Sequence, residues 1–316
     1  MTIVDLFAGL GGWDLGARAA GLPDPLGIEW NPDACATRRA VGLPTLEADV
    51  EALDPSQFAP VEGLIASPPC QDFSRAGRHA GVTGDRGRLV YEPVRWIDAL
   101  RPRWVALEQV DNVLPIWEEI ASRLIVSGYS TWAGILSAEE YGVPQTRRRA
   151  ILLASLDRQA HPPAPTHQAY RFGEPAEEVE TLFGTRRPWV SMAEALGWDD
   201  DVVLDRRQTG ARLVNTSEAP SPTLTATAVG KGVWAFSRPS TTIAGDPRAF
   251  QPGSHHYAPG AQSQNALRLE LSEGLILQGF PADYPVAGST KRSRWLQVGN
   301  AVPPPLAAAI LDTLTR

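Results

Sequence analysis

Two reactive side chains follow short apolar runs of the sequence. Cys70 comes after the run 63–66, in a loop with two consecutive prolines, and Glu108 directly follows the run 104–107. A cysteine thiolate is a strong nucleophile, and a carboxyl group can hold or deliver a proton. Because the carboxyl ends of parallel strands meet at one edge of a sheet, these residue types predict a nucleophile and an acid beside one substrate.

A glycine-rich turn, 5–12, joins the first apolar run to the first helical pattern. Such a turn lets a ligand approach the backbone. The dinucleotide pattern requires a glycine at position 14, where this chain has Asp14, so a nicotinamide dehydrogenase is disfavoured. Glu29 and Asp49 end the next two strands, and although either alone would suit a helix cap, together they can bind a ribose and an adenine amino group. The set predicts an adenosine ligand without pyrophosphate, and S-adenosylmethionine fits.

The remaining polar candidates lie in one extended segment. It contains Gln145, Arg147 and Arg149, with the arginines expected on one face. Cys35 lies within an apparent helix and is expected to be a buried apolar residue. Two cysteines in the whole chain exclude a disulfide scaffold and a four-cysteine zinc site, and no metal site is predicted.

The elements that must position these residues alternate between short apolar runs and helical patterns. Asn31 followed by Pro32 is a typical helix start. Strand–helix alternation predicts a doubly wound α/β sheet. We expect strands at 3–7, 26–28, 45–48, 63–66, 104–107, 132–136 and 150–154, and helices at 13–20, near 114–126, near 272–278 and at 304–314.

The amino-acid composition of the sequence changes after about residue 156. Residues 157–265 are rich in proline, glycine, serine and threonine and predict a smaller, irregular domain. Regular patterns return at 266. We therefore predict a ligand-binding domain of residues 1–156 that is completed by 266–316.

Charge is unevenly distributed along the 316 residues. The formal charge of −7 argues against bulk attraction to nucleic acid. However, residues 1–74 hold 11 acids and 3 bases, whereas 75–103 hold 7 bases and 3 acids. Only Lys231 and Lys291 among the 29 basic residues are lysines, and guanidinium groups suit phosphates and base edges. No apolar run reaches the ~18 residues of a membrane span, and the N-terminus lacks a signal pattern, so a cytoplasmic protein is expected.

Six segments of this sequence resemble, in order, the motifs of the cytosine-C5 DNA methyltransferases. They surround the variable stretch 157–265, which occupies the place of that family's target-recognition domain. The resemblance implies a Rossmann-like methyltransferase sheet and methylation of cytosine in double-stranded DNA. The segments are 5–12, 68–71, 108–110, 145–149, 268–281 and 297–303.

The resemblance also implies roles for individual residues. Cys70 would attack C6 of cytosine, Glu108 would hold and protonate N3, and Arg147 and Arg149 would assist beside them. A base inside a duplex cannot be reached, so the cytosine must be flipped out. S-adenosylmethionine would supply the methyl group, bound by Phe7, Gly9, Gly11, Glu29, Trp30, Asp49, Asn300 and Val302.

The segment after Cys70 alternates arginines with glycines, which predicts a basic loop that closes over DNA. The chain departs from the family at position 109, where Gln109 replaces the asparagine of the Glu-Asn-Val motif. This change puts the geometry of the local loop in question. The expected DNA contacts are Gln71, Ser74, Arg75, Arg78, Arg86 and Arg88.

Two other functions compete with DNA methylation. The same chemistry on RNA is one, although the 109-residue variable region favours sequence-specific DNA reading. A DNA-binding relative without catalysis is the other, and the intact Cys70, Glu108, Arg147 and Arg149 argue against it. The predicted partners are double-stranded DNA and a cognate restriction endonuclease, with a monomeric chain and no membrane.

Overall fold

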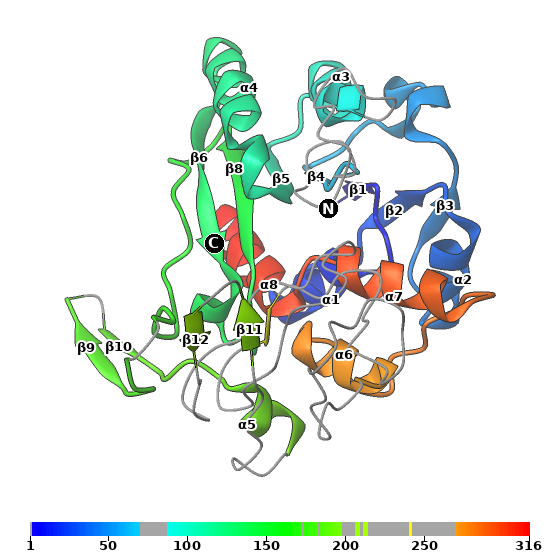
Figure 1. The fold of residues 1–316 in the computed structure, drawn as a ribbon. Helices are drawn as coiled ribbons and strands as arrows, with labels where there is room; N and C mark the ends of the chain where they lie inside the picture. Colours follow the sequence, from blue (N-terminus) through cyan, green and yellow to red (C-terminus); the bar gives the residue numbers. More distant parts are fainter. Residues whose placement is uncertain are drawn as a thin grey trace.

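One seven-stranded sheet forms the centre of the structure, a computed structural model (Figure 1). The strand order is β3-β2-β1-β4-β5-β8-β6, and the first five strands run parallel while β8 runs antiparallel to both neighbours. This confirms the predicted Rossmann-like α/β class. The strands are β1 (Ile3–Leu6), β2 (Leu26–Glu29), β3 (Thr45–Glu47), β4 (Gly63–Ala66), β5 (Trp104–Val110), β6 (Ser130–Ser137) and β8 (Arg148–Ser155).

The structure describes residues 2–69, 87–171, 174–182, 184–197, 206–208, 211–213, 240–241 and 269–316. Cys70, Gln71, Ser74, Arg75, Arg78 and Arg86 lie outside the described residues. Much of 157–265 lies outside them too, so the predicted domain boundaries stay predictions. Its described strands are β9 (Val179–Thr181), β10 (Gly184–Arg186), β11 (Arg206–Gln208), β12 (Ala211–Leu213) and β13 (Ser240–Thr241), with β7 (Gln145–Thr146) pairing with β13.

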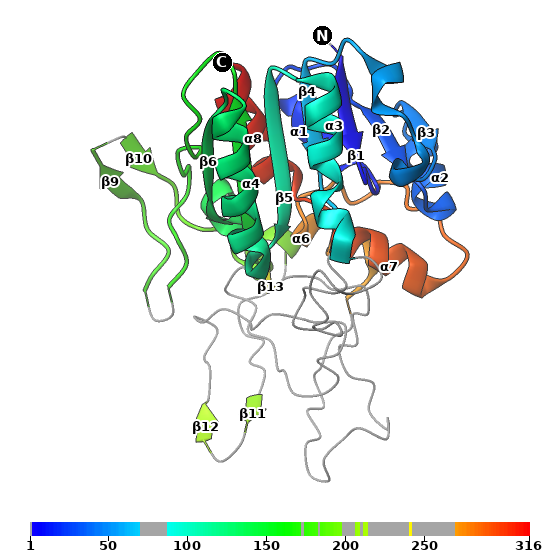
Figure 2. The ribbon, with the colours of Figure 1, turned by 90° about the horizontal axis from the view of Figure 1, so that it is seen from above.

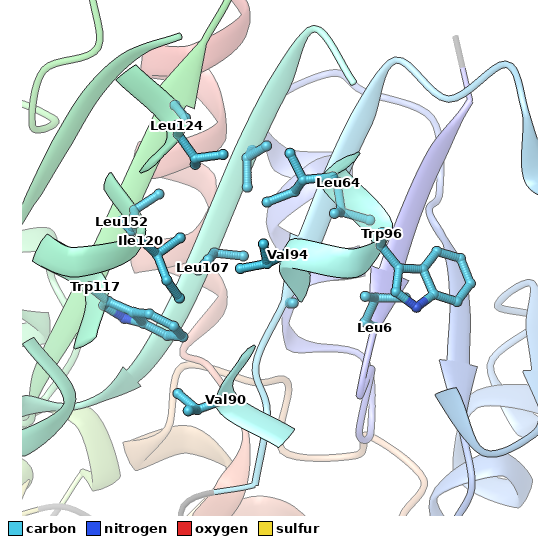
Figure 3. Close-up of a cluster of buried hydrophobic side chains, with 14 of the residues drawn as sticks. Leu6, Leu64, Val90, Val94, Trp96, Leu107, Trp117, Ile120, Leu124 and Leu152 are labelled. Carbon is cyan, nitrogen blue, oxygen red and sulfur yellow. The ribbon is translucent and has the colours of Figure 1, made fainter. Parts of the chain in front are cut away.

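Helices cover both faces of the sheet (Figure 1). On one face, α3 (Glu92–Leu100) and α4 (Leu114–Val126) pack on alternate residues of the strands. On the other, α1 (Gly12–Ala19) packs against α8 (Pro304–Thr315). The period of two is clear in β8, where Leu152 faces α4 and Leu153 faces α8. Figure 3 shows Trp117, Ile120 and Leu124 of α4 on the first of these cores.

A third group of elements lies across the carboxyl end of the parallel strands (Figure 2). Here α6 (Leu271–Leu277) and α7 (Lys291–Asn300) form a separate apolar cluster with α5 (Met192–Leu196). The other helices are α2 (Pro32–Ala40) and the short 3₁₀ turns Val50–Ala52, Pro55–Phe58, Gly87–Tyr91, Asp111–Val113 and Ala138–Tyr141. Within the part of the chain that the structure describes, no helix is both long and apolar enough to cross a bilayer.

The predicted strands and helices lie within two residues of those in the structure except at β5, whereas α3, α5 and α7 were not predicted. That strand was expected to end at Leu107, but it continues to Val110 because β8 pairs with it along its whole length, from Trp104 opposite Ser155 to Val110 opposite Arg149. The extension matters because Glu108 consequently lies within the strand rather than in a loop after it. Asn31 caps α2 as expected, accepting a hydrogen bond from the Ala34 amide at 3.1 Å.

The register of β4 and β5 depends on a glycine. Gly63 pairs with Trp104, and a Cβ at Gly63 would lie 2.0 Å from the indole ring. We therefore expect Gly63→Ala to lower the free energy of unfolding by about 1–3 kcal/mol through overpacking. Urea denaturation measures this, and in a Trp104→Leu background, where the ring is gone, the cost should shrink. An equal cost in both backgrounds would contradict the explanation.

Candidate active site

The site residues gather where the parallel strands end, at the edge that α6 and α7 cover (Figure 2). The turn after β1 has an unusual backbone, since Phe7, Gly9 and Gly11 have φ angles of 61°, 55° and 109°. Such angles suit glycine but are strained for phenylalanine. An added Cβ at Gly9 would meet nothing within 4 Å, so this glycine borders open space.

The Glu29 carboxylate ties this turn to the end of β2. It accepts hydrogen bonds from the Gly9 amide at 2.9 Å and from the Asn31 amide at 2.8 Å. Trp30, next in sequence, is 55% exposed although it is large and apolar, and Asp49 is exposed at the start of a 3₁₀ turn. An exposed indole between two acids is suited to stack on an adenine while the acids bind polar groups of a nucleoside.

Residues from the far end of the chain complete this edge. A Cβ at Gly12 would lie 2.1 Å from the Val302 carbonyl oxygen, so the backbone of 301–303 packs directly on the start of α1. Asn300 is exposed as the last residue of α7. The structure therefore brings Val302 to the glycine turn, with Asn300 two residues before it in the chain.

A buried carboxyl group lies beneath the same turn. Asp5 is fully buried, and neither of its oxygens has a hydrogen-bond partner among the described residues. Burial, with the Asp14 carboxyl as the next cause, raises the pKa of Asp5 well above its usual range. Burial at this position therefore disfavours the charged form of Asp5.

Glu108 and Arg149 face each other across β5 and β8. The Arg149 Nε lies 2.8 Å from the Glu108 Oε1, and both side chains are at most one-tenth exposed. Arg149 also donates to the Arg148 carbonyl at 2.7 Å. The ion pair therefore holds one Glu108 oxygen against the neighbouring strand.

Arg147 lies apart from this pair, although the sequence predicted both arginines on one face. Its guanidinium is 1% exposed and donates to the carbonyl oxygens of Gly299 and Ala301 at 3.0 Å each. Arg147 immediately precedes β8, and its side chain points to the return segment while Arg149 points to β5. Arg147 therefore ties the start of β8 to the return segment.

Two glutamines extend this network. Gln145 donates to the Gln278 side-chain oxygen at 2.7 Å and to the Leu277 carbonyl at 3.1 Å. Gln278 is fully buried and donates to the Ala301 carbonyl at 2.6 Å. Segments more than 130 residues apart in sequence are thus joined by buried amide groups, whose hydrogen bonds are expensive to break.

The loop that leads to Cys70 is anchored at its start. The Gln109 side chain donates to the Pro68 carbonyl and accepts from the Val110 amide at 2.6 Å. The Trp13 indole donates to the Ser67 hydroxyl at 2.9 Å. The extra methylene of Gln109 is therefore used to reach across from β5 to the loop, a contact that the sequence did not reveal.

Arg88 is the one predicted DNA contact that the structure describes. Its guanidinium lies 2.7 Å from the Glu51 carboxylate and is mostly exposed. Arg38, which was not predicted as a site residue, is completely buried, whereas Arg39 beside it is exposed and pairs with Glu47. These neighbours differ only in the face of α2 on which they lie, because Arg38 is on the buried face and Arg39 is on the exposed face.

Comparison with known proteins gives a consistent result. A sequence profile of the C-5 cytosine-specific DNA methylases matches residues 1–316. Type II methyltransferase M1.HphI of Haemophilus parahaemolyticus is 29% identical over 337 residues, covering 100% of this chain and 87% of that protein. Type II methyltransferase M.HgiDI of Herpetosiphon aurantiacus is 29% identical over 323 residues, covering 99% and 94%.

Solved structures share the fold. A putative DNA modification methyltransferase encoded within an E. coli prophage superposes with a TM-score of 0.66 at 19% identity, covering 99% of this chain and 98% of that one. The Dnmt2 methyltransferase of S. pombe gives a TM-score of 0.66 at 17% identity, covering 99% and 98%.

Glu139 makes the stability of this region depend on pH. Its Oε2 accepts a hydrogen bond from the Arg147 amide at 3.3 Å, and burial raises the pKa of Glu139 to about 7. The fold favours the protonated form, so stability is fully present below the unfolded pKa and falls as the pH rises through 7. We expect this change to cost about 3 kcal/mol.

Urea unfolding at pH 5 and pH 8 measures the effect. Glu139→Gln mimics the neutral carboxyl, so the variant should lose less stability between these pH values than the original chain. Glu118→Gln, an exposed position on α4, is the control and should leave the pH difference unchanged. An unaltered pH difference in Glu139→Gln would refute the assignment.

Proposed function

The chain belongs to the C-5 cytosine-specific DNA methylase family and is therefore a DNA (cytosine-5-)-methyltransferase; from that premise we propose how its residues act. The substrate is a cytosine flipped out of a specific double-stranded sequence, and the donor is S-adenosylmethionine. The observation that carries the proposal is that Glu108, paired with Arg149, directly precedes Gln109, which holds the loop that leads to Cys70.

Cys70 and Glu108 act together because C6 of cytosine is a poor electrophile. We propose that the Cys70 thiolate forms a bond to C6 while Glu108 delivers a proton to N3, so the displaced electron pair does not remain as a bare charge. C5 then becomes nucleophilic and would take the methyl group of the donor, with the bond from that carbon to sulfur breaking and a neutral thioether leaving. Afterwards the C5 proton is removed by a base, the bond from sulfur to C6 breaks, and N3 returns its proton.

Arg149 holds Glu108 in place for this step. The pair at 2.8 Å fixes one carboxylate oxygen, so the other oxygen can face N3 in a fixed orientation. Arg147 would act indirectly, by holding Gly299 and Ala301 and with them the segment around Val302. This assignment differs from the expectation that both arginines assist at the base.

The donor-binding residues are proposed from the glycine turn and its surroundings. Glu29 would bind the ribose, Trp30 would stack on the adenine, and Asp49 would bind the adenine amino group. Phe7, Gly9 and Gly11 would border the donor, with Asn300 and Val302 closing the pocket. When bound, S-adenosylmethionine supplies an electrophilic methyl group on a sulfonium.

DNA contacts are proposed for the segment that follows the nucleophile. Its composition supports a basic loop with Gln71, Ser74, Arg75, Arg78, Arg86 and Arg88 near phosphates. The type II names of M1.HphI and M.HgiDI support a role in restriction–modification beside a cognate endonuclease, with this chain acting as a monomer.

A methyl-transfer assay tests the function and the nucleophile. Radiolabelled S-adenosylmethionine is incubated with DNA, RNA or free nucleotide, and label is expected only in DNA, with bisulfite sequencing to locate it. Cys70→Ser should abolish transfer and Glu108→Gln should reduce it by at least ~100-fold, whereas Cys35→Ser should retain it. Label in RNA alone, or full activity of Cys70→Ser, would overturn the proposal.

Gln109 gives a separate prediction about loop position. Gln109→Leu removes the donor to the Pro68 carbonyl, so we expect kcat to fall by about 10–100-fold with little change in the KM of the donor. Gln109→Asn keeps the amide but shortens its reach, so its kcat should lie between that of the original chain and that of Gln109→Leu. Single-turnover rates measure this, and an active Gln109→Leu would show that the contact is dispensable.

A further inference from the structure

Side chains from distant elements hold three consecutive residues of the glycine turn. One is an arginine of α2, one is the glutamate that ends β2, and one is a tyrosine between α6 and α7. Each binds a backbone atom, which leaves the turn little freedom to shift. The contacts are Arg38 Nη1 to the Ala8 oxygen at 3.4 Å, the Gly9 amide to Glu29 Oε2 at 2.9 Å, and the Tyr284 hydroxyl to the Leu10 oxygen at 2.7 Å.

Arg38 is the centre of this arrangement. Its guanidinium makes a two-pronged ion pair with Asp14 of α1 at 2.7 and 2.8 Å, and both side chains are fully buried. It also donates to the Pro44 carbonyl at 3.1 Å and to the Thr45 hydroxyl at 3.2 Å. One side chain thus joins the glycine turn, the first turn of α1 and the start of β3.

The surrounding backbone is shaped to admit these side chains. A Cβ at Gly27 would lie 2.1 Å from the Arg38 Nη2, so only glycine leaves room for the guanidinium. A Cβ at Gly11 would lie 2.9 Å from the Tyr284 hydroxyl. Tyr284 is itself buried and packs edge-to-face on Phe280 at 5.1 Å.

Stability alone does not account for the ion pair. A buried pair commonly stabilises a fold no more than well-packed apolar residues of the same volume would. What the pair supplies is a fixed direction for its hydrogen bonds. The turn needs such support because Phe7 is held in a left-handed conformation, which persists only where the surroundings fix it.

We infer that Arg38, oriented by Asp14, and Tyr284 are positioning residues for the methyl-donor site. They act through the backbone of Ala8 and Leu10 and touch neither donor nor cytosine. The inference rests on the proposed role of the glycine turn in binding S-adenosylmethionine. Arg38 supports the turn at Ala8 and Tyr284 supports it at Leu10, although these two side chains are separated by more than 240 residues in sequence.

Tyr284→Phe is the most conservative test, because it removes one hydroxyl and keeps the ring. We expect the Kd of S-adenosylhomocysteine by calorimetry and the KM of S-adenosylmethionine to rise about fivefold. The kcat at saturating donor and the affinity for DNA without donor should not change. Tyr129→Phe is the matched control, because that buried hydroxyl also donates to a carbonyl, that of Pro102, at 2.7 Å, but at the opposite edge of the sheet.

A second variant separates positioning from packing. Asp14→Leu combined with Arg38→Met removes the charges and fills the space, so the unfolding midpoint in urea should stay near that of the original chain while donor binding weakens about fivefold or more. Should this variant fail to fold, Tyr284→Phe and its control decide alone.

Unchanged donor binding in Tyr284→Phe, or an equal loss in Tyr129→Phe, would overturn the inference. The original chain is assayed for methyl transfer to DNA in parallel. If it transfers no methyl group, the proposed function fails. If it transfers normally and Tyr284→Phe binds donor normally, only the positioning role fails.

Discussion

The buried guanidinium of Arg147 determines where the last part of the chain lies. By binding the carbonyls of Gly299 and Ala301, it fixes the end of α7 against the start of β8. The contact of Val302 with Gly12 and the packing of α8 on α1 follow from that position. The edge of the sheet that we propose binds the methyl donor is therefore assembled from both ends of the sequence, and neither end forms it alone.

The antiparallel strand β8 has a second consequence. Because it returns along β5, it brings Arg149 opposite Val110, so the guanidinium can pair with Glu108 two residues earlier on β5. If β8 ran parallel to β5, its C-terminal end would lie at this edge, and Arg149, which is near its N-terminal end, would lie at the opposite edge. One strand thus supplies the partner of the acid, and the residue just before it supplies the anchor of the return segment.

Much of this was predictable from the sequence, for reasons that are local. Apolar runs of four residues, the Asn31–Pro32 helix start and the acids at strand ends each report on their own neighbourhood. Long-range pairing is different. Arg38 and Arg39 are adjacent and identical, yet one is buried against Asp14 and the other pairs with Glu47 at the surface. Arg147 and Arg149 diverge similarly, because the backbone before β8 turns one of them to α7.

Buried charge around the glycine turn is paired rather than left free. Asp14 and Arg38 form an ion pair in which both side chains are fully buried, and burial disfavours the charged form of the neighbouring Asp5. The Glu29 carboxylate accepts hydrogen bonds from the Gly9 and Asn31 amides. The count of acidic residues in the first 74 positions therefore overstates the negative charge at this edge of the sheet.

Glu108 and the loop that leads to Cys70, the proposed acid and nucleophile, are linked more directly than their separation in sequence suggests. Glu108 and Gln109 are consecutive in β5, and Gln109 holds Pro68, which precedes Cys70 by two residues. A shift of β5 would therefore move Glu108 together with the Pro68 end of the loop. The proposed reaction needs two groups held in a fixed geometry, and Gln109, the residue that departs from the family motif, joins the strand of one to the loop of the other.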